Sequence, residues 1–251
     1  MPSFKQATLL RGELPSWATT KSHARQLLVE AAVPRPNGNS WPAVTIEISV
    51  SEDGKLQARE FPARRWPTFC PQRHINKGGH FCLGLSDIPL GLADVPIVND
   101  ANSARRWWEI LASHLQTQFV ADALKLWPPH LEWDHGEAGE IQSSMEQLVE
   151  QHGLLNDVKS AHLYGEGWLA GELPRLTKKA DRLVNGRSPC PRGCKKRKHP
   201  ILRRACPKRE VVFQLVKLER EKRKQSAFFW EAAKNEQCCG QMRNCPLKRS
   251  V

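Results

Sequence analysis

The sequence lacks any long hydrophobic run. Its mean hydropathy is −0.53, and no stretch approaches the roughly 18 apolar residues that a membrane-spanning helix needs. The opening residues, 1–6, contain no apolar segment of the kind that a secretory signal requires. We therefore expect a cytoplasmic protein with no membrane partner.

Cysteine is scarce in most of the chain, and acidic residues are scarce at its end. Six of the eight cysteines lie in residues 187–251, where 19 Lys or Arg face five Glu and give a net charge of +14. Residues 1–186 carry a net charge of −2. Because the cytoplasm keeps thiols reduced, the cysteines are expected to be thiols or metal ligands rather than disulfides.

Charge and cysteine content change together near residue 187, which predicts a domain boundary. We divide the chain into a first domain over 1–130, a helical extension over 131–186 and a basic cysteine-rich region over 187–251. No internal repeat is present.

Hydrophobic spacing gives the order of the elements. Val44, Ile46 and Ile48 alternate with polar residues, which is the period of a half-buried strand. The predicted elements are a helix over 17–33, strands over 44–50 and 56–61, a helix over 103–127 with Ser103 as its N-cap, a helix over 137–151, a further element within 154–184 and a charged helix over 208–234. This order indicates an α+β fold with the helices segregated from an antiparallel sheet.

The run from His74 to Leu85 contains a histidine, an asparagine, two adjacent glycines and Cys82. A cysteine presented on a glycine turn can act as a nucleophile or carry a thioester. A cysteine in a short apolar run, such as Phe81–Leu83, is often a buried core residue instead. Both interpretations of Cys82 are open, and the order of the flanking residues favours the reactive one. Cys70, between Phe69 and Pro71, is interpreted as a packing residue.

These residues resemble the active-site region of ubiquitin-conjugating enzymes. Residues 61–67, with Phe61-Pro62 and Pro67, resemble the proline-rich approach of that family, residues 74–76 resemble its His-Pro-Asn motif, and residues 79–83 resemble its Gly-x-x-Cys-Leu turn. The resemblance covers roughly residues 20–128. There are two departures: Ile75 replaces the motif proline, and Asn76 is closer to Cys82 than is usual.

The resemblance implies a UBC-like β-meander with flanking helices, in a bacterial member of the superfamily. It implies an acyl transferase in which Cys82 takes the C-terminal glycine of a ubiquitin-like protein from an activating enzyme and passes it to an amine of a protein substrate. Asn76 would bind the oxyanion or pin the loop, and His74 would shape the motif. His80 would share the face of Cys82, where it could lower the thiol pKa or carry a proton.

The basic region has cysteine spacings that suit a structural zinc ion, because short turns rich in Pro and Gly let two sulfur atoms face one metal. Its cysteines are the candidate ligands: Cys190, Cys194, Cys206, Cys238, Cys239 and Cys245. We prefer Cys190, Cys194, Cys239 and Cys245, with Cys206, Cys238 and His199 as substitutes. Reduced free thiols and partial disulfides are the alternatives.

The basic residues of the same region could contact nucleic-acid phosphates. No regular pattern of stacking aromatic residues accompanies them, so a solvated face or a docking patch for an acidic protein is favoured. Two rival functions stay open: a catalytically inactive binding module of the same fold, and a zinc-dependent nucleic-acid-binding protein.

Overall fold

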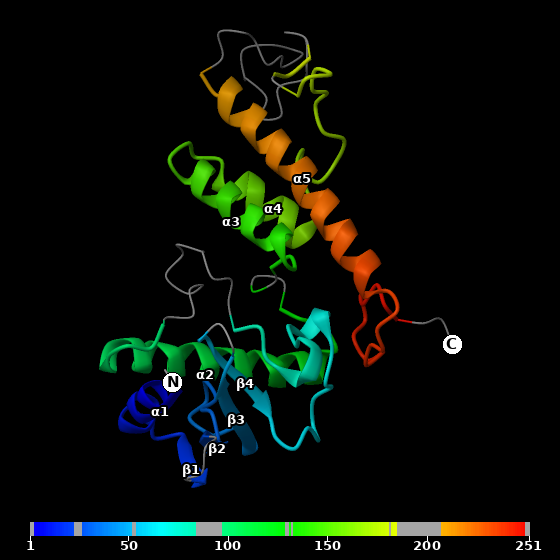
Figure 1. Ribbon diagram of the computed structural model, residues 1–251. Helices are drawn as coiled ribbons and strands as arrows, with labels where there is room; N and C mark the ends of the chain where they lie inside the picture. Colours follow the sequence, from blue (N-terminus) through cyan, green and yellow to red (C-terminus); the bar gives the residue numbers. More distant parts are fainter. Residues whose placement is uncertain are drawn as a thin grey trace. The chain divides into compact units, whose positions relative to one another are not determined.

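The computed structural model describes residues 3–22, 27–51, 54–83, 97–128, 131, 133–180, 182–184 and 207–248. The chain divides into two compact units (Figure 1). The first comprises residues 1–128 together with the C-terminal segment 233–251, and the second comprises residues 129–232.

The first unit is built on a four-stranded antiparallel meander, in which each strand pairs with the next along the chain. The strands are β1 (Ala18–Ser22), β2 (Leu27–Ala31), β3 (Val44–Val50) and β4 (Leu56–Glu60). The strands predicted over 44–50 and 56–61 are confirmed. The helix predicted over 17–33 is wrong, because Leu27, Val29 and Ala31 alternate inward as a strand against β3.

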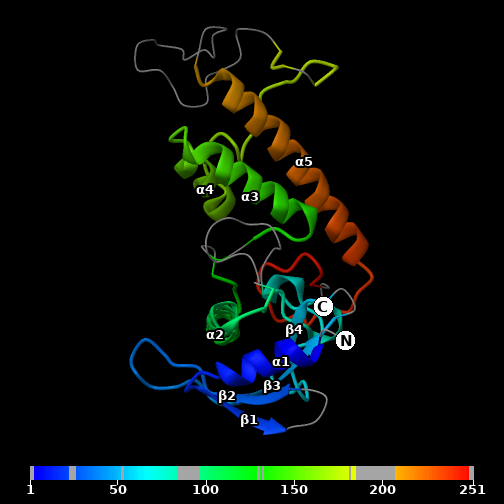
Figure 2. The ribbon, with the colours of Figure 1, turned by 60° about the vertical axis from the view of Figure 1, so that its left-hand side comes forward.

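Two helices pack with this sheet, α1 (Ser3–Gly12) and α2 (Ala101–Leu124) (Figures 1 and 2). The core between them contains Trp107 and Trp108, and the indole of Trp108 donates a hydrogen bond to the carbonyl of Leu10 in α1. The N-cap of α2 is Asp100. Ser103 lies three residues later and completes a capping box with it. The prediction of Ser103 as the N-cap is therefore wrong, while the helix itself is confirmed.

The described residues of the second unit contain α3 (Glu137–Glu150), α4 (Leu155–Tyr164) and α5 (Arg209–Ala233). The apolar residues of these helices, Met145, Val158 and Leu215 among them, share one core. The helices predicted over 137–151 and 208–234 are confirmed within a residue or two. The two units together give the α+β class that the sequence predicts. Within the described part of the chain, no helix combines the length and the apolar character needed to cross a bilayer.

Candidate active site and cysteine cluster

The segment that follows β4 folds back on itself in a series of paired backbone positions. Cys70 and Ile75 exchange two backbone hydrogen bonds of 3.0 Å around the short helix η1 (Pro71–Arg73). Ile75 in turn pairs with Phe81, around the second short helix η2 (Lys77–Gly79). The amide of Phe81 then donates to the carbonyl of Ala58 in β4. The whole loop is thereby tied to the edge of the sheet.

Cys82 lies at the end of an extended segment over residues 80–82. Its amide donates a 2.7 Å hydrogen bond to the carbonyl of His74. Phe81 is buried, whereas His80 and Cys82 on either side of it are only partly buried. Because side chains alternate along an extended chain, His80 and Cys82 lie on the same, outer face of the segment. Cys82 is therefore a partly exposed thiol and not a core residue.

His80 lies two residues before Cys82 and is partly buried. Its Nδ1 atom is buried without a hydrogen-bond partner among the described residues. Burial and then the positive charge of Arg59 lower its pKa below 6.5, so its ring is mainly neutral at neutral pH. A neutral imidazole can accept a proton.

Asn76 and His74 differ in exposure. The side chain of Asn76 is exposed, while its backbone is fixed by hydrogen bonds with His80 and Gly79. His74 is buried in a left-handed conformation with φ 51°, and its ring lies 4.8 Å from that of Trp127. The buried His74 thus contacts the backbone of Cys82 through its carbonyl, and the side chain of Asn76 lies exposed on the same turn.

The centre of the loop is anchored by Arg73, which the sequence did not single out. Its side chain is fully buried. It donates to the side-chain and main-chain oxygens of Gln118 and to the carboxylate of Asp122, at 3.1–3.3 Å. Gln118 donates back to the carbonyl of Arg73. Polar residues four apart on the buried face of a predicted helix were the signal that could have revealed this anchor.

His114, one turn before Gln118 on α2, was also missed. Its ring lies 5.0 Å from Phe81 and 5.6 Å from Trp127, and its Nε2 is 3.0 Å from the amide nitrogen of Gln118. Burial, followed by the positive charge of Arg73, lowers the pKa of His114 to about 3. It is therefore a buried, neutral residue that packs against Phe81, behind the Cys82 segment.

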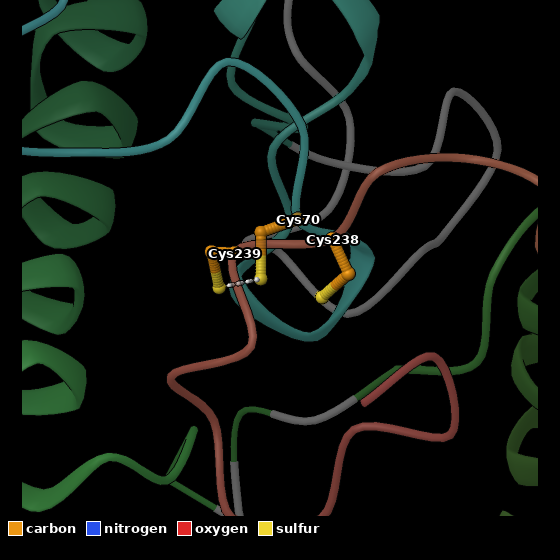
Figure 3. Close-up of side chains that lie close together, drawn as sticks. All are labelled: Cys70, Cys238 and Cys239. Atoms are coloured by element: carbon orange, nitrogen blue, oxygen red, sulfur yellow. Dashed lines mark hydrogen bonds between the residues drawn. The ribbon is translucent and has the colours of Figure 1, made fainter. Parts of the chain in front are cut away.

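A second group of cysteines lies at the other end of the loop (Figure 3). The C-terminal segment of the first unit brings Cys239 within 3.3 Å of Cys70, measured between the sulfur atoms, and Cys238 within 3.2 Å of Cys245. The sulfur atoms of Cys70, Cys238 and Cys239 all lie within 4.8 Å of one another. This arrangement is compatible with metal binding. Below we call these four residues the cysteine cluster.

The shared environment of these sulfur atoms shifts their pKa values in opposite directions. The interaction with Cys70 lowers the pKa of the Cys239 thiol to about 5, and the same interaction, with burial, raises that of Cys70. Burial and Cys238 raise the pKa of Cys245 to about 12. Neighbouring sulfur atoms cannot all take a negative charge unless a cation lies among them.

Of the six cysteines proposed from the sequence as ligands, the structure brings together Cys238, Cys239 and Cys245. Cys190, Cys194 and Cys206, as well as the basic run around them, lie outside the described residues. Cys70 joins the cluster from the loop that follows β4, whereas the other three cysteines belong to the C-terminal segment. It is buried, as a packing residue would be, but its sulfur contacts another sulfur, and spacing along the sequence gave no sign of this.

Comparison with known proteins adds two family matches. Residues 16–129 match the model of the prokaryotic E2 domain. Residues 134–247 match the model described as a cysteine-rich domain C-terminal to the E2 domain. Among curated proteins and solved structures, no significant match is found. The first match supports a ubiquitin-conjugating-like function in general, and an E2 domain implies interaction with a ubiquitin-like protein and its activating enzyme.

Proposed function

We propose that this chain, a prokaryotic E2 domain followed by a cysteine-rich domain, carries a ubiquitin-like protein as a thioester on Cys82 and transfers it to an amine. The observation that carries the proposal is the position of Cys82, partly exposed on the outer face of an extended segment that β4 and His74 hold by backbone hydrogen bonds. A fixed, accessible thiol is what acyl transfer needs.

The proposed chemistry has two steps. The Cys82 thiolate attacks the C-terminal carbonyl carbon of the modifier, which arrives as a thioester on the activating enzyme. A new C–S bond forms and the activating enzyme's thiolate leaves. An amine of the protein substrate then attacks the same carbon, the bond to Cys82 breaks, and the amine loses its proton as the amide forms.

The neighbouring residues supply the other roles. Asn76, exposed on the rim of the turn, donates its side-chain amide to the oxyanion, an interaction whose removal costs about 2.7–4 kcal/mol of barrier. His80, neutral because its pKa is lowered, accepts the amine proton. His74 supports the loop through its carbonyl and its packed ring.

We further propose that the cysteine-rich domain holds a structural zinc ion, because clustered thiols are the ligands that zinc prefers in proteins. Its partners would be the ubiquitin-like protein, the activating enzyme and a protein substrate. A reducing compartment such as the cytoplasm would keep Cys82 able to form a thioester and the clustered cysteines able to bind metal.

A thioester assay tests the proposal. The full chain is incubated with an activating enzyme, ATP and a ubiquitin-like protein, and the products are separated with and without reductant. We expect an adduct that reductant removes, and none with Cys82→Ala. Cys82→Ser is the matched control, since an oxygen ester would survive reductant and show that position 82 is the site of attachment.

The rival functions give other results. A binding module would form no adduct with any activating enzyme tested, and its Cys82→Ala variant would bind the modifier as tightly as the wild-type chain does. A chain that instead binds nucleic acid, with affinity that falls steeply as salt rises, would favour the nucleic-acid alternative.

A further inference from the structure

We propose that Cys70, Cys238, Cys239 and Cys245 bind one zinc ion as a four-sulfur site, and that this ion fastens the C-terminal segment to the loop that presents Cys82. Three of the ligands come from the cysteine-rich domain, and the fourth, Cys70, comes from the E2 domain. The site therefore joins the two domains through metal–sulfur bonds.

Three of the sulfur atoms, those of Cys70, Cys238 and Cys239, are already spaced for a tetrahedral ion, while the sulfur of Cys245, beside Cys238, has to move closer to at least one of the other two. Zinc–sulfur bonds of about 2.3 Å place the four sulfurs of a tetrahedral site roughly 3.8 Å apart. The contacts of 3.3 Å between Cys70 and Cys239 and 3.2 Å between Cys238 and Cys245 need to open by only about half an ångström to reach this spacing. The two close pairs lie together, since Cys238 is also within 4.8 Å of Cys70 and Cys239.

The backbone around Cys239 and Cys245 already donates hydrogen bonds to their sulfur atoms. The amides of Gln241 and Met242 donate to the sulfur of Cys239, and the amide of Leu247 donates to that of Cys245. Gly240, with φ 68°, allows the turn that brings the first two amides back. Hydrogen bonds of this kind orient metal ligands and stabilise thiolates.

The surroundings of the cluster suit a buried ion of this type. Cys70 and Cys245 are buried, and Ala121, Trp127 and Met242 pack beside them, so this side of the site is shielded from water, while Cys238 and Cys239 are partly buried. A zinc ion with four thiolates carries a formal charge of −2. The segment 234–248 carries a net charge of +2, from three basic residues and one glutamate, which offsets that charge.

The position of Cys70 connects the site to the Cys82 segment. Cys70 pairs with Ile75, Ile75 pairs with Phe81, and Phe81 immediately precedes Cys82. Two more contacts join the C-terminal segment to the same region: Lys77 of η2 forms a 2.6 Å ion pair with Glu236, and the amide of Arg243 donates to the carbonyl of Lys125. Fixing Cys70 therefore restricts the backbone that sets the direction of Cys82.

Metal content of the full chain tests the ligand set. Purified under reducing conditions, the wild-type chain is expected to hold a zinc equivalent that the Cys70→Ser variant lacks, while the variant keeps the circular dichroism of the wild-type fold. Cys190→Ser is the informative comparison, because the ligand set preferred from the sequence includes Cys190 and omits Cys70. Equal zinc in Cys70→Ser and wild type would overturn the proposal.

A second measurement on the wild-type chain needs no variant. Alkylation is followed for each cysteine peptide with and without a strong zinc chelator. We expect the chelator to make all four cluster cysteines reactive together. A chelator effect confined to the tail cysteines, with Cys70 unchanged, would overturn the proposal. The proposal would also be overturned if the intact mass were lower than that of the fully reduced chain by the hydrogens lost when two disulfides form within the cluster.

The consequence for Cys82 rests on the proposed function, and its test is kept separate. Zinc removal or Cys70→Ser is expected to slow thioester formation on Cys82 about 10- to 100-fold, because small misplacements of a reacting group cost rates of that order. Unchanged charging in a zinc-free chain would refute the coupling. If the wild type itself forms no thioester, the proposed function fails, while the metal and alkylation results still decide the ligand set.

Discussion

Cys70 and Cys82 lie at opposite ends of one loop and occupy opposite environments. Cys70 is fully buried, with another sulfur atom 3.3 Å away. Cys82 is partly exposed on the outer face of an extended segment. The difference follows from the backbone: Cys70 is paired with Ile75 and lies inside beside Cys239, whereas Cys82 follows the buried Phe81 and lies on the outer face. This difference in surroundings is the basis for proposing a metal-binding role for one thiol and a reactive role for the other.

The two ends are not independent, because Arg73 anchors the loop between them. The largest expected effect comes from Arg73→Leu, which takes this donor from the buried side-chain oxygen of Gln118 and leaves the carboxylate of Asp122 with Lys125 and Arg65 as its remaining partners. A buried acceptor left unsatisfied costs about 1–3 kcal/mol, and loss of the pair with the partly exposed Asp122 carboxylate adds to that cost. Denaturant unfolding would measure the loss, and both Cys82 alkylation and zinc release should become faster.

Arg65→Leu is the matched control for that variant. Arg65 also approaches the carboxylate of Asp122, at 3.7 Å, but its side chain is 37% exposed. A surface pair of this kind contributes about 0–1 kcal/mol. Similar losses for the two arginine variants would show that burial of Arg73 does not anchor the loop.

The sequence predicted the parts of the fold that depend on local periodicity. Strands β3 and β4 and helices α2, α3 and α5 each carry a clear apolar period over their own length. The segment 17–33 was ambiguous, because Leu27 and Ala31 are four apart, as in a helix, and are also on one face of a strand. Only the pairing of this segment with β3 distinguishes the strand from the helix.

The site was predictable to a similar extent. The motif around Cys82 is local, so its residues could be named from the sequence. The contacts of Arg73 with α2, and of Cys70 with Cys239, join residues 45 and 169 positions apart. The polar residues spaced four apart on α2 mark one side of the Arg73 contact, but which residue meets them depends on how the chain returns to itself, and spacing along the sequence does not encode that.

Lowering the pH is expected to destabilise the region behind the Cys82 segment, because His114 is buried there. The pKa of His114 is about 3 in the folded state, below the ordinary 6.5 of an unfolded chain. Below pH 6.5 the unfolded state therefore binds more protons, and stability falls as the pH drops from 6.5 towards 3. Between pH 7 and pH 5 the first unit should lose about 2 kcal/mol through this group.

Hydrogen exchange of the α2 amides at pH 7, 6 and 5 would measure that loss within the first unit. His114→Gln removes the titrating group, so its stability should depend less on pH, whatever its value at pH 7. His135 in the second unit, whose pKa burial lowers to about 4, should give a separate acid loss there that His114→Gln leaves unchanged. An identical pH slope in the α2 amides of wild type and variant would contradict the assignment.

Gly79→Ala tests the turn that precedes Cys82. Gly79 has φ 82°, and its amide donates to the carbonyl of Thr68. A side chain in the left-handed region costs about 1–2 kcal/mol, so we expect a loss of that size, faster Cys82 alkylation and unchanged zinc content. Gly12→Ala is the control, since Gly12 ends α1 with open space around it and no positive φ. Equal effects of the two alanines would rule out strain at the turn.

The smallest expected effect comes from the ion pair between Lys77 and Glu236, whose side chains are 68% and 34% exposed. A double-mutant cycle with Lys77→Ala and Glu236→Ala should give a coupling of about 0.2–1 kcal/mol that falls as salt screens it.

Zinc binding is expected to hold the C-terminal segment more strongly than this ion pair does. Hydrogen-exchange protection of the segment should therefore hardly change in the single variants while the metal is present. After chelation the same variants should release the segment further, because the ion pair is then among the few contacts left to hold it. Variants that release the segment with zinc in place would mean that charge, rather than the four sulfur atoms, fastens the segment beside the Cys82 loop.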